Sequence, residues 1–121
     1  MRLLLHNVLK SNSLGSKIGY PLGLECSQSR IVESDFHLQL LKNMYQKIDY
    51  KVLYDASRIV GYNELPEFPP DSLFEDEAFG KIFHHAIMEI DVVEGFLICP
   101  DTGYRYVIHE SIPDMIIPHK L

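Results

Sequence analysis

The residues best suited to chemistry in this chain are its thiols and imidazoles. The sequence has two cysteines, Cys26 and Cys99, and six histidines. A thiolate beside an imidazole can act as a nucleophile, but Cys99 precedes a turn and no orienting motif accompanies it. His84 and His85 are adjacent, so on a helix they point about 100° apart and cannot bind one metal from the same face. A structural role for both histidines is therefore the better prediction.

Motifs that bind cofactors are missing from the sequence. No glycine-rich segment follows a strand in the way that holds a nucleotide or S-adenosylmethionine. Serine, histidine and aspartate are present, but none stands in a nucleophile-elbow context. A metal-dependent hydrolase would need clustered ligands, whereas His6, His37, His109 and His119 are scattered along the chain. We therefore predict that the chain binds no cofactor and is not an enzyme on its own.

Composition and charge narrow the function classes further. The 121 residues, 46% apolar and 23% charged, fit one compact soluble protein. Its apolar windows are too short to span a bilayer, and the opening residues do not have the pattern of a signal peptide. We therefore expect reduced thiols in the cytosol or nucleus. The net charge of −6 disfavours autonomous binding to nucleic acid. The acidic stretch of residues 64–77 is interpreted as a solvated loop and the first turn of a helix.

One segment has the frame of a zinc ribbon without its ligands. Residues 94–99 form a strand pattern, residues 99–103 read Cys-Pro-Asp-Thr-Gly, and residues 104–108 return with Tyr104, Tyr106 and Ile108 on one side. In this frame Thr102 replaces the second cysteine of the knuckle. Structural zinc takes four ligands, usually from Cys-x₂₋₄-Cys pairs. Because only Cys99 remains, the segment predicts a β-hairpin that holds no structural zinc.

The remaining pattern predicts an α+β fold. Residues 1–9, 20–24 and 30–33 are typical of short extended segments, whereas residues 34–48 and 49–60 have the apolar spacing of helices. A third helix is expected from Ser72, which has capping-box spacing to Glu75. From residue 88 the apolar residues recur with the period of two that is typical of a strand, with Gly95 at a bulge or sharp bend. We expect a small zinc-ribbon-like antiparallel or mixed sheet built from both chain termini, with an inserted three-helix segment. The expected domains are residues 1–33 plus 88–121 and residues 34–87.

Two terminal motifs are specific in combination. The chain opens with Met-Arg-Leu-Leu-Leu-His-Asn-Val-Leu and closes with the hairpin of residues 94–108 and the segment Ile-Pro-Asp-Met-Ile-Ile of residues 112–117. With these motifs the whole chain resembles the multifunctional methyltransferase subunit family of eukaryotes. Members of that family are small activators of tRNA, ribosomal-RNA and release-factor methyltransferases. The helical middle agrees in order and length more than in residue identity.

The resemblance also implies where a metal would be held. In zinc-bearing members, one cysteine pair follows the opening segment and a second pair forms the knuckle. The matching positions here are Ser11 and Ser16 for the first pair, and Cys99 and Thr102 for the second. Since three of these four positions are not cysteine, we expect no zinc and expect core packing to replace it.

By the same resemblance, the chain is a non-catalytic activating and stabilising subunit. The partner would supply a Rossmann-like fold, S-adenosylmethionine and the acceptor site, in a one-to-one heterodimer formed by β-augmentation and apolar contacts. Release factor, tRNA or ribosomal RNA would be reached only through that partner, in the cytoplasm and nucleus, with no membrane involved. The alternative is an autonomous nucleic-acid-binding ribbon domain.

Apolar residues near both ends of the chain are the candidate partner-binding surface. One small hairpin cannot bury all of them on one face, although any single one could instead close the protein's own core. A surface of methionine and aliphatic side chains would suit a subunit that serves several partners. The candidates are Leu4, Leu5, Phe96, Met115, Ile116 and Ile117.

Overall fold

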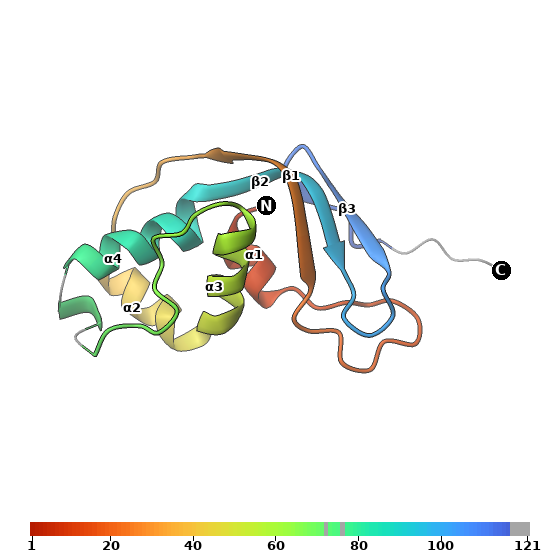
Figure 1. Ribbon diagram of the computed structural model, residues 1–121, viewed down its shortest axis with the longest axis horizontal. Helices are drawn as coiled ribbons and strands as arrows, with labels where there is room; N and C mark the ends of the chain where they lie inside the picture. The colour runs from red at the N-terminus through yellow and green to blue at the C-terminus, as the bar shows by residue number, and fades with distance from the viewer. Residues whose placement is uncertain (72, 76, 117–121) are drawn as a thin grey trace.

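A computed structural model of the protein describes residues 1–71, 73–75 and 77–116. It has the predicted α+β architecture, with helices at one end of an elongated molecule and a four-stranded antiparallel sheet at the other (Figure 1). The elements in chain order are α1 (Leu3–Val8), β1 (Gly23–Ile31), α2 (Leu38–Lys47), α3 (Tyr50–Ile59), a 3₁₀ turn (Leu73–Glu75), α4 (Glu77–His84), a π-helical turn (His85–Glu89), β2 (Ile90–Ile98), β3 (Arg105–His109) and β4 (Ile112–Pro113). The predicted helix start at Ser72 lies outside the described residues.

The sheet has strand order β1-β2-β3-β4, and its inner face is apolar. Alternate side chains on β2 and β3 point into the core, so Leu97, Tyr106 and Ile108 are buried as the period of two predicts. The bend predicted at Gly95 corresponds to a register shift in the strand facing it, between Cys26 and Gln28. A Cβ atom at Gly95 would overlap the carbonyl oxygen of Glu25, so this position needs glycine.

The opening segment corrects the sequence prediction. Residues 1–9 were expected to form a strand, but only Met1 and Arg2 run along β2, through a hydrogen bond from Val92 N to Met1 O (2.7 Å) and a bridge between Arg2 and Asp91. From Leu3 the chain is helical. Its buried residues Leu3, His6 and Asn7 recur at helical spacing, which places one face of α1 against the core. In addition, the two extended segments expected at residues 20–24 and 30–33 overlap the two ends of one strand, β1, which runs from Gly23 to Ile31.

Polar side chains of α1 connect the helical end to the sheet. Asn7 donates to the carbonyl of Asp49 (2.8 Å) and accepts from its N–H (2.9 Å), just where Asp49 caps α3 by accepting from Val52 N. His6 Nε2 bonds to the carbonyl of Leu22 before β1 (2.8 Å). Burial lowers the pKa of His6, which favours a neutral ring that donates from Nε2.

One continuous apolar core runs through the helices and the sheet. It includes Leu3 of α1, Leu53 of α3 and Leu97 of β2, which are all fully buried. A Cβ atom at Gly80 in α4 would lie 3.3 Å from the ring of Phe36 and 3.7 Å from that of Phe74, which is the close packing expected there. The predicted domain division into residues 1–33 plus 88–121 and residues 34–87 stays a prediction. The apolar core contains residues of both predicted domains and therefore marks no boundary between them.

The α-amino group of Met1 is held in a buried polar cage. Its ammonium donates to Asp91 Oδ1 (2.6 Å), to the carbonyl of Val92 (2.8 Å) and to the carbonyl of Ser111 (2.6 Å). Asp91 Oδ2 also accepts from Arg30 Nε (2.8 Å) and Ser111 Oγ (2.7 Å). Burial alone would raise the pKa of Asp91, but the hydrogen bonds from the ammonium, Ser111 and Arg30 outweigh burial and lower it. One carboxylate therefore joins four segments of the chain.

Replacing Asp91 by asparagine should lower the free energy of unfolding by about 3 kcal/mol at neutral pH, because the ammonium of Met1 is then buried without a counter-charge. Urea unfolding followed by circular dichroism measures this. Asp55→Asn is the matched control: Asp55 pairs with Lys51 on the surface, with side chains 55% and 66% exposed. That pair should be worth less than about 1 kcal/mol.

The stability difference between the wild type and Asp91→Asn should also depend on pH. Because the folded pKa of Asp91 lies below its ordinary value, its stabilising contribution is full above the ordinary pKa and is lost as the pH falls through the lowered pKa. The stability gap between the wild type and Asp91→Asn should therefore narrow in acid. A gap that stays constant from neutral to strongly acidic pH would contradict this assignment.

Candidate functional site

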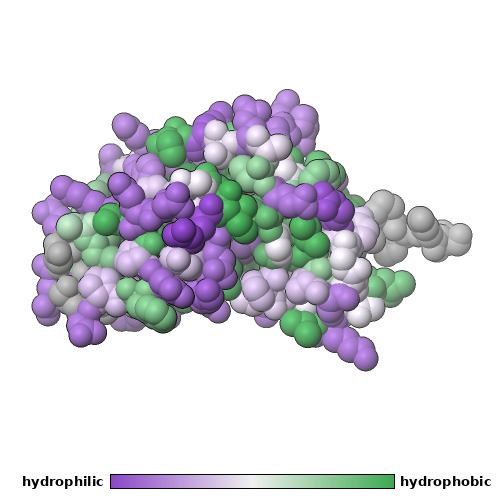
Figure 2. Space-filling view, viewed as in Figure 1, coloured by the Kyte–Doolittle hydropathy of each residue, from purple (hydrophilic) through white to green (hydrophobic). Residues whose placement is uncertain are grey.

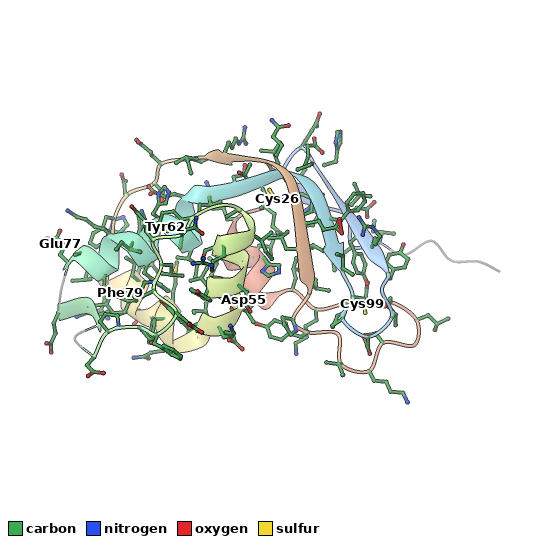
Figure 3. The ribbon with its side chains drawn as sticks, in the orientation of Figure 1. Cys26, Asp55, Tyr62, Glu77, Phe79 and Cys99 are labelled. Carbon is green, nitrogen blue, oxygen red and sulfur yellow. The ribbon has the colours of Figure 1, made fainter. Side chains whose placement is uncertain are left out.

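The tip of the β2–β3 hairpin meets the loop of residues 10–22 in a cluster of small polar side chains. We call Ser11, Ser13, Ser16, Cys99, Asp101 and Thr102 the knuckle cluster. Ser13 Oγ donates to Cys99 Sγ (3.3 Å) and lies 2.8 Å from Thr102 Oγ1 and 2.9 Å from Ser11 Oγ. Cys99 lies at the hairpin tip, far from Cys26 on β1, and both thiols are free (Figure 3).

Asp101 closes the knuckle cluster from the outside. Its carboxylate accepts hydrogen bonds from Cys99 Sγ (3.0 Å), Ser16 Oγ (2.9 Å) and the backbone N–H groups of Lys17 and Ile18. The hydrogen bond from Cys99, followed by those from Ile18 and Lys17, holds the pKa of Asp101 well below its usual range. The loop is thus fixed to the hairpin by a charge-assisted network.

The four positions that match the zinc ligands of the family do converge in space. Ser11, Ser16 and Thr102 surround Cys99, but their hydroxyls already have other partners. Ser11 and Thr102 are hydrogen-bonded to Ser13, and Ser16 to Cys99 and Asp101. One thiol and three hydroxyls do not fit a structural zinc ion, which needs thiolate or imidazole ligands. Within the described ranges, no group of three or more His, Cys, Asp or Glu side chains is arranged to hold a metal.

A groove of about 630 Å³ runs along α1 between the helices and the sheet. Its floor is aliphatic, from Leu4, Leu5 and Val8 of α1 and from Val32 and Met88. The polar groups at its rim include the buried cage around the Asp91 carboxylate. We call this the α1 groove; the remaining lining residues are Met1, Arg2, Arg30, Asp91 and Ser111.

The predicted partner-binding residues occupy three places. Leu4 is half-buried and Leu5 is 39% exposed, and both line the α1 groove. Met115 packs partly against the core and Ile116 is 80% exposed just beyond β4. Phe96 is half-buried on the sheet face opposite Leu97, with the Arg105 guanidinium 4.3 Å from its ring centre. Ile117 lies outside the described residues.

A second groove, of about 520 Å³, separates α3 from the start of β1. Apolar residues gather in the middle of this face (Figure 2). They include Val52 and Ile59 of α3 and Ile98 of β2, with the buried His6 behind them. Sequence reasoning singled out none of these residues as a surface, because each also fits an ordinary core position.

The fold and the site together define a small α+β subunit with a polar knuckle and an apolar groove. No family model matches the chain, but curated relatives do. It is 40% identical over 119 residues to the multifunctional methyltransferase subunit TRM112 homolog B of Arabidopsis thaliana, covering 97% of this chain and 96% of that protein. It is 34% identical over 118 residues to the TRM112-like protein of Mus musculus, covering 97% and 94%.

A solved structure agrees with this sequence match. The Trm112 fold in the E. cuniculi Mtq2–Trm112 complex, described as responsible for methylation of the eRF1 translation termination factor, matches 99% of this chain and 100% of that one. The TM-score is 0.60 and the identity 25%. The chain therefore belongs to the multifunctional methyltransferase subunit (TRM112) family. In the part of the chain that is described, no helix has the length and apolar character needed to cross a membrane.

Sequence reasoning missed two features of the site. It did not assign Ser13 and Asp101 to the knuckle cluster, although both stand within three residues of the positions matched to zinc ligands. It also missed Arg2 and Arg30 of the α1 groove, because a strand at residues 1–9 would not form a groove with the sheet in which these arginines come together. The signal available for the knuckle was the density of serines in residues 11–16.

Replacing Ser13 by alanine should lower the free energy of unfolding by about 1–3 kcal/mol, because it leaves buried partners in the knuckle cluster unsatisfied. Thermal and urea unfolding measure this loss. Ser27→Ala is the control, since its exposed hydroxyl makes one hydrogen bond to Glu94 O (3.1 Å). Equal effects of the two substitutions would contradict the structural role of the cluster.

Proposed function

We propose that this chain is the non-catalytic activating subunit of an S-adenosylmethionine-dependent methyltransferase that acts on a translation component, and that a release factor is the foremost substrate. The observation that carries the proposal is its match, over nearly the full length of both chains, to the Trm112 chain of a complex that methylates eRF1. The curated relatives, all named as methyltransferase subunits, support it. Their shared description as multifunctional methyltransferase subunits supports more than one catalytic partner, and the family resemblance adds tRNA and ribosomal-RNA methyltransferases to the proposal.

In this proposal the partner supplies the chemistry. S-adenosylmethionine and the acceptor side chain bind to the catalytic subunit, and this chain stabilises that subunit by covering its apolar surface in a one-to-one heterodimer. We also place the heterodimer in the cytoplasm and nucleus, where translation factors and ribosomal RNA are methylated. The polar knuckle, fixed by hydrogen bonds without thiolate pairs, supports a chain that takes no zinc.

The end of the sheet is suited to β-augmentation. β4 spans only Ile112–Pro113, and Asp114 N extends the pairing by donating to Val107 O (2.8 Å). Ile112 in β4 is 69% exposed, and Ile116 just beyond it is 80% exposed. An added strand on this edge would gain main-chain hydrogen bonds, and the exposed isoleucines would set its register.

Co-expression with a release-factor glutamine methyltransferase of the same organism should give a one-to-one complex on size-exclusion chromatography, with methyl transfer to the release factor only when both chains are present. Ile116→Asp should reduce co-purification and activity at least about tenfold, because a carboxylate is buried at the contact. Leu14→Asp, on a residue 97% exposed in the loop, is the control. The proposal fails if no methyltransferase of that organism co-purifies or gains activity.

Metal analysis of the purified heterodimer addresses the zinc proposal. The chain should contain no stoichiometric zinc, and a strong chelator should leave its melting temperature unchanged, because hydrogen bonds hold the knuckle. Restoring cysteine at Ser11, Ser16 and Thr102 together should produce a chain that binds one zinc ion and responds to the chelator. Zinc bound by the wild-type chain would overturn this part of the proposal.

A further inference from the structure

The α1 groove carries a concentration of positive charge in an acidic protein. The net charge of the chain is −6, yet the groove is lined by the ammonium of Met1 and the guanidinium groups of Arg2 and Arg30, against the single carboxylate of Asp91. Asp91 is already engaged by the ammonium (2.6 Å) and by Arg30 Nε (2.8 Å). The groove therefore presents positive charge that its own carboxylate does not balance.

Arg2 is the available cation. Arg2 is exposed to solvent. Its guanidinium has no hydrogen-bond or ion-pair partner among the residues that the structure describes. Its backbone is nonetheless fixed, since its carbonyl accepts from Leu5 N (3.1 Å) and the residue bridges to Asp91 on β2. A charged group on a fixed backbone beside an aliphatic floor has the chemistry of an interface anchor.

We propose that the α1 groove binds a segment of the methyltransferase catalytic subunit that combines aliphatic side chains with an aspartate or glutamate. The aliphatic side chains pack on Leu4, Leu5 and Val8, and the carboxylate accepts paired hydrogen bonds from the Arg2 guanidinium. This inference rests on the proposed function and names the chemistry of the contact. The catalytic subunit would then contact the α1 groove as well as the edge beyond β4. A carboxylate on the catalytic subunit that can pair with Arg2 would distinguish partners from other proteins.

The aliphatic floor of the α1 groove favours a protein segment over nucleic acid as the bound partner. A phosphate backbone would satisfy Arg2 but would leave Leu5 (39% exposed) and Val8 (57% exposed) uncovered. The rest of the chain, with its excess of acidic residues, would repel it. An acidic and aliphatic protein segment satisfies both parts of the groove.

The experiment measures the affinity of the purified chain for its catalytic subunit by biolayer interferometry. Arg2→Glu and Val8→Asp should each weaken binding by roughly tenfold or more, and the Arg2→Glu effect should shrink as salt is raised. The matched controls on α3 are Arg58→Glu and Ile59→Asp, which change an exposed arginine and a half-exposed isoleucine outside the groove and should bind like the wild type. The melting temperature of the Arg2→Glu chain alone should be unchanged, since the guanidinium has no described partner to lose.

A charge-reversal cycle makes the test specific. Acidic residues on the catalytic subunit are changed to lysine one at a time, and one of these changes should restore binding to Arg2→Glu. If the wild type binds but Arg2→Glu binds equally well, or no reversal restores binding, the groove inference fails and the activating function stands. If the wild type does not bind a catalytic subunit at all, both fail. Binding of the wild-type chain alone to an RNA oligonucleotide, lost in Arg2→Glu, would also overturn the inference.

Discussion

The carboxylate of Asp91 is the constraint on which the rest of the structure depends. A buried ammonium is costly unless it is paired and hydrogen-bonded, and Asp91 on β2 provides that pairing for Met1. The same carboxylate accepts from Arg30 on β1 and Ser111 before β4, so it joins the first residue of the chain to two strands and to the turn between β3 and β4. Once Met1 is fixed on the sheet, the next turn of chain has to lie against the core.

That anchoring sets the position of α1, and α1 in turn joins the two ends of the molecule. The helix lies between the sheet and α3, with Leu3 in the shared core. Asn7 satisfies both backbone groups of Asp49 at the start of α3, and His6 bonds to Leu22 at the entry to β1. The opposite face of α1 remains partly uncovered and forms the floor of the α1 groove. A single short helix therefore organises the interior and supplies the candidate interaction surface.

The knuckle illustrates how a fold can keep its geometry while its metal-binding chemistry changes. In a zinc ribbon, four strong ligands hold a loop to a hairpin. Here Asp101 and the hydroxyls around Cys99 make the same connection with hydrogen bonds. Each such bond contributes about 1 kcal/mol net, far less than a bound metal, so several must act together with the apolar core. The connection between the loop and the hairpin is therefore shared between these hydrogen bonds and the packing of Tyr106 beneath them.

Local periodicity and turn chemistry were sufficient to predict the α+β class, the inserted helices, the hairpin and the bend at Gly95. The terminal motifs were enough to indicate the family. The helical conformation of residues 3–8 depends on long-range packing, since a short apolar run fits a strand or a helix until its packing partners are known. The tertiary structure also decided which residues share the α1 groove and the knuckle cluster. Both sites join segments that are distant in the chain, and their contacts depend on the long-range pairing of Met1 with Asp91 and of Ser13 with Cys99.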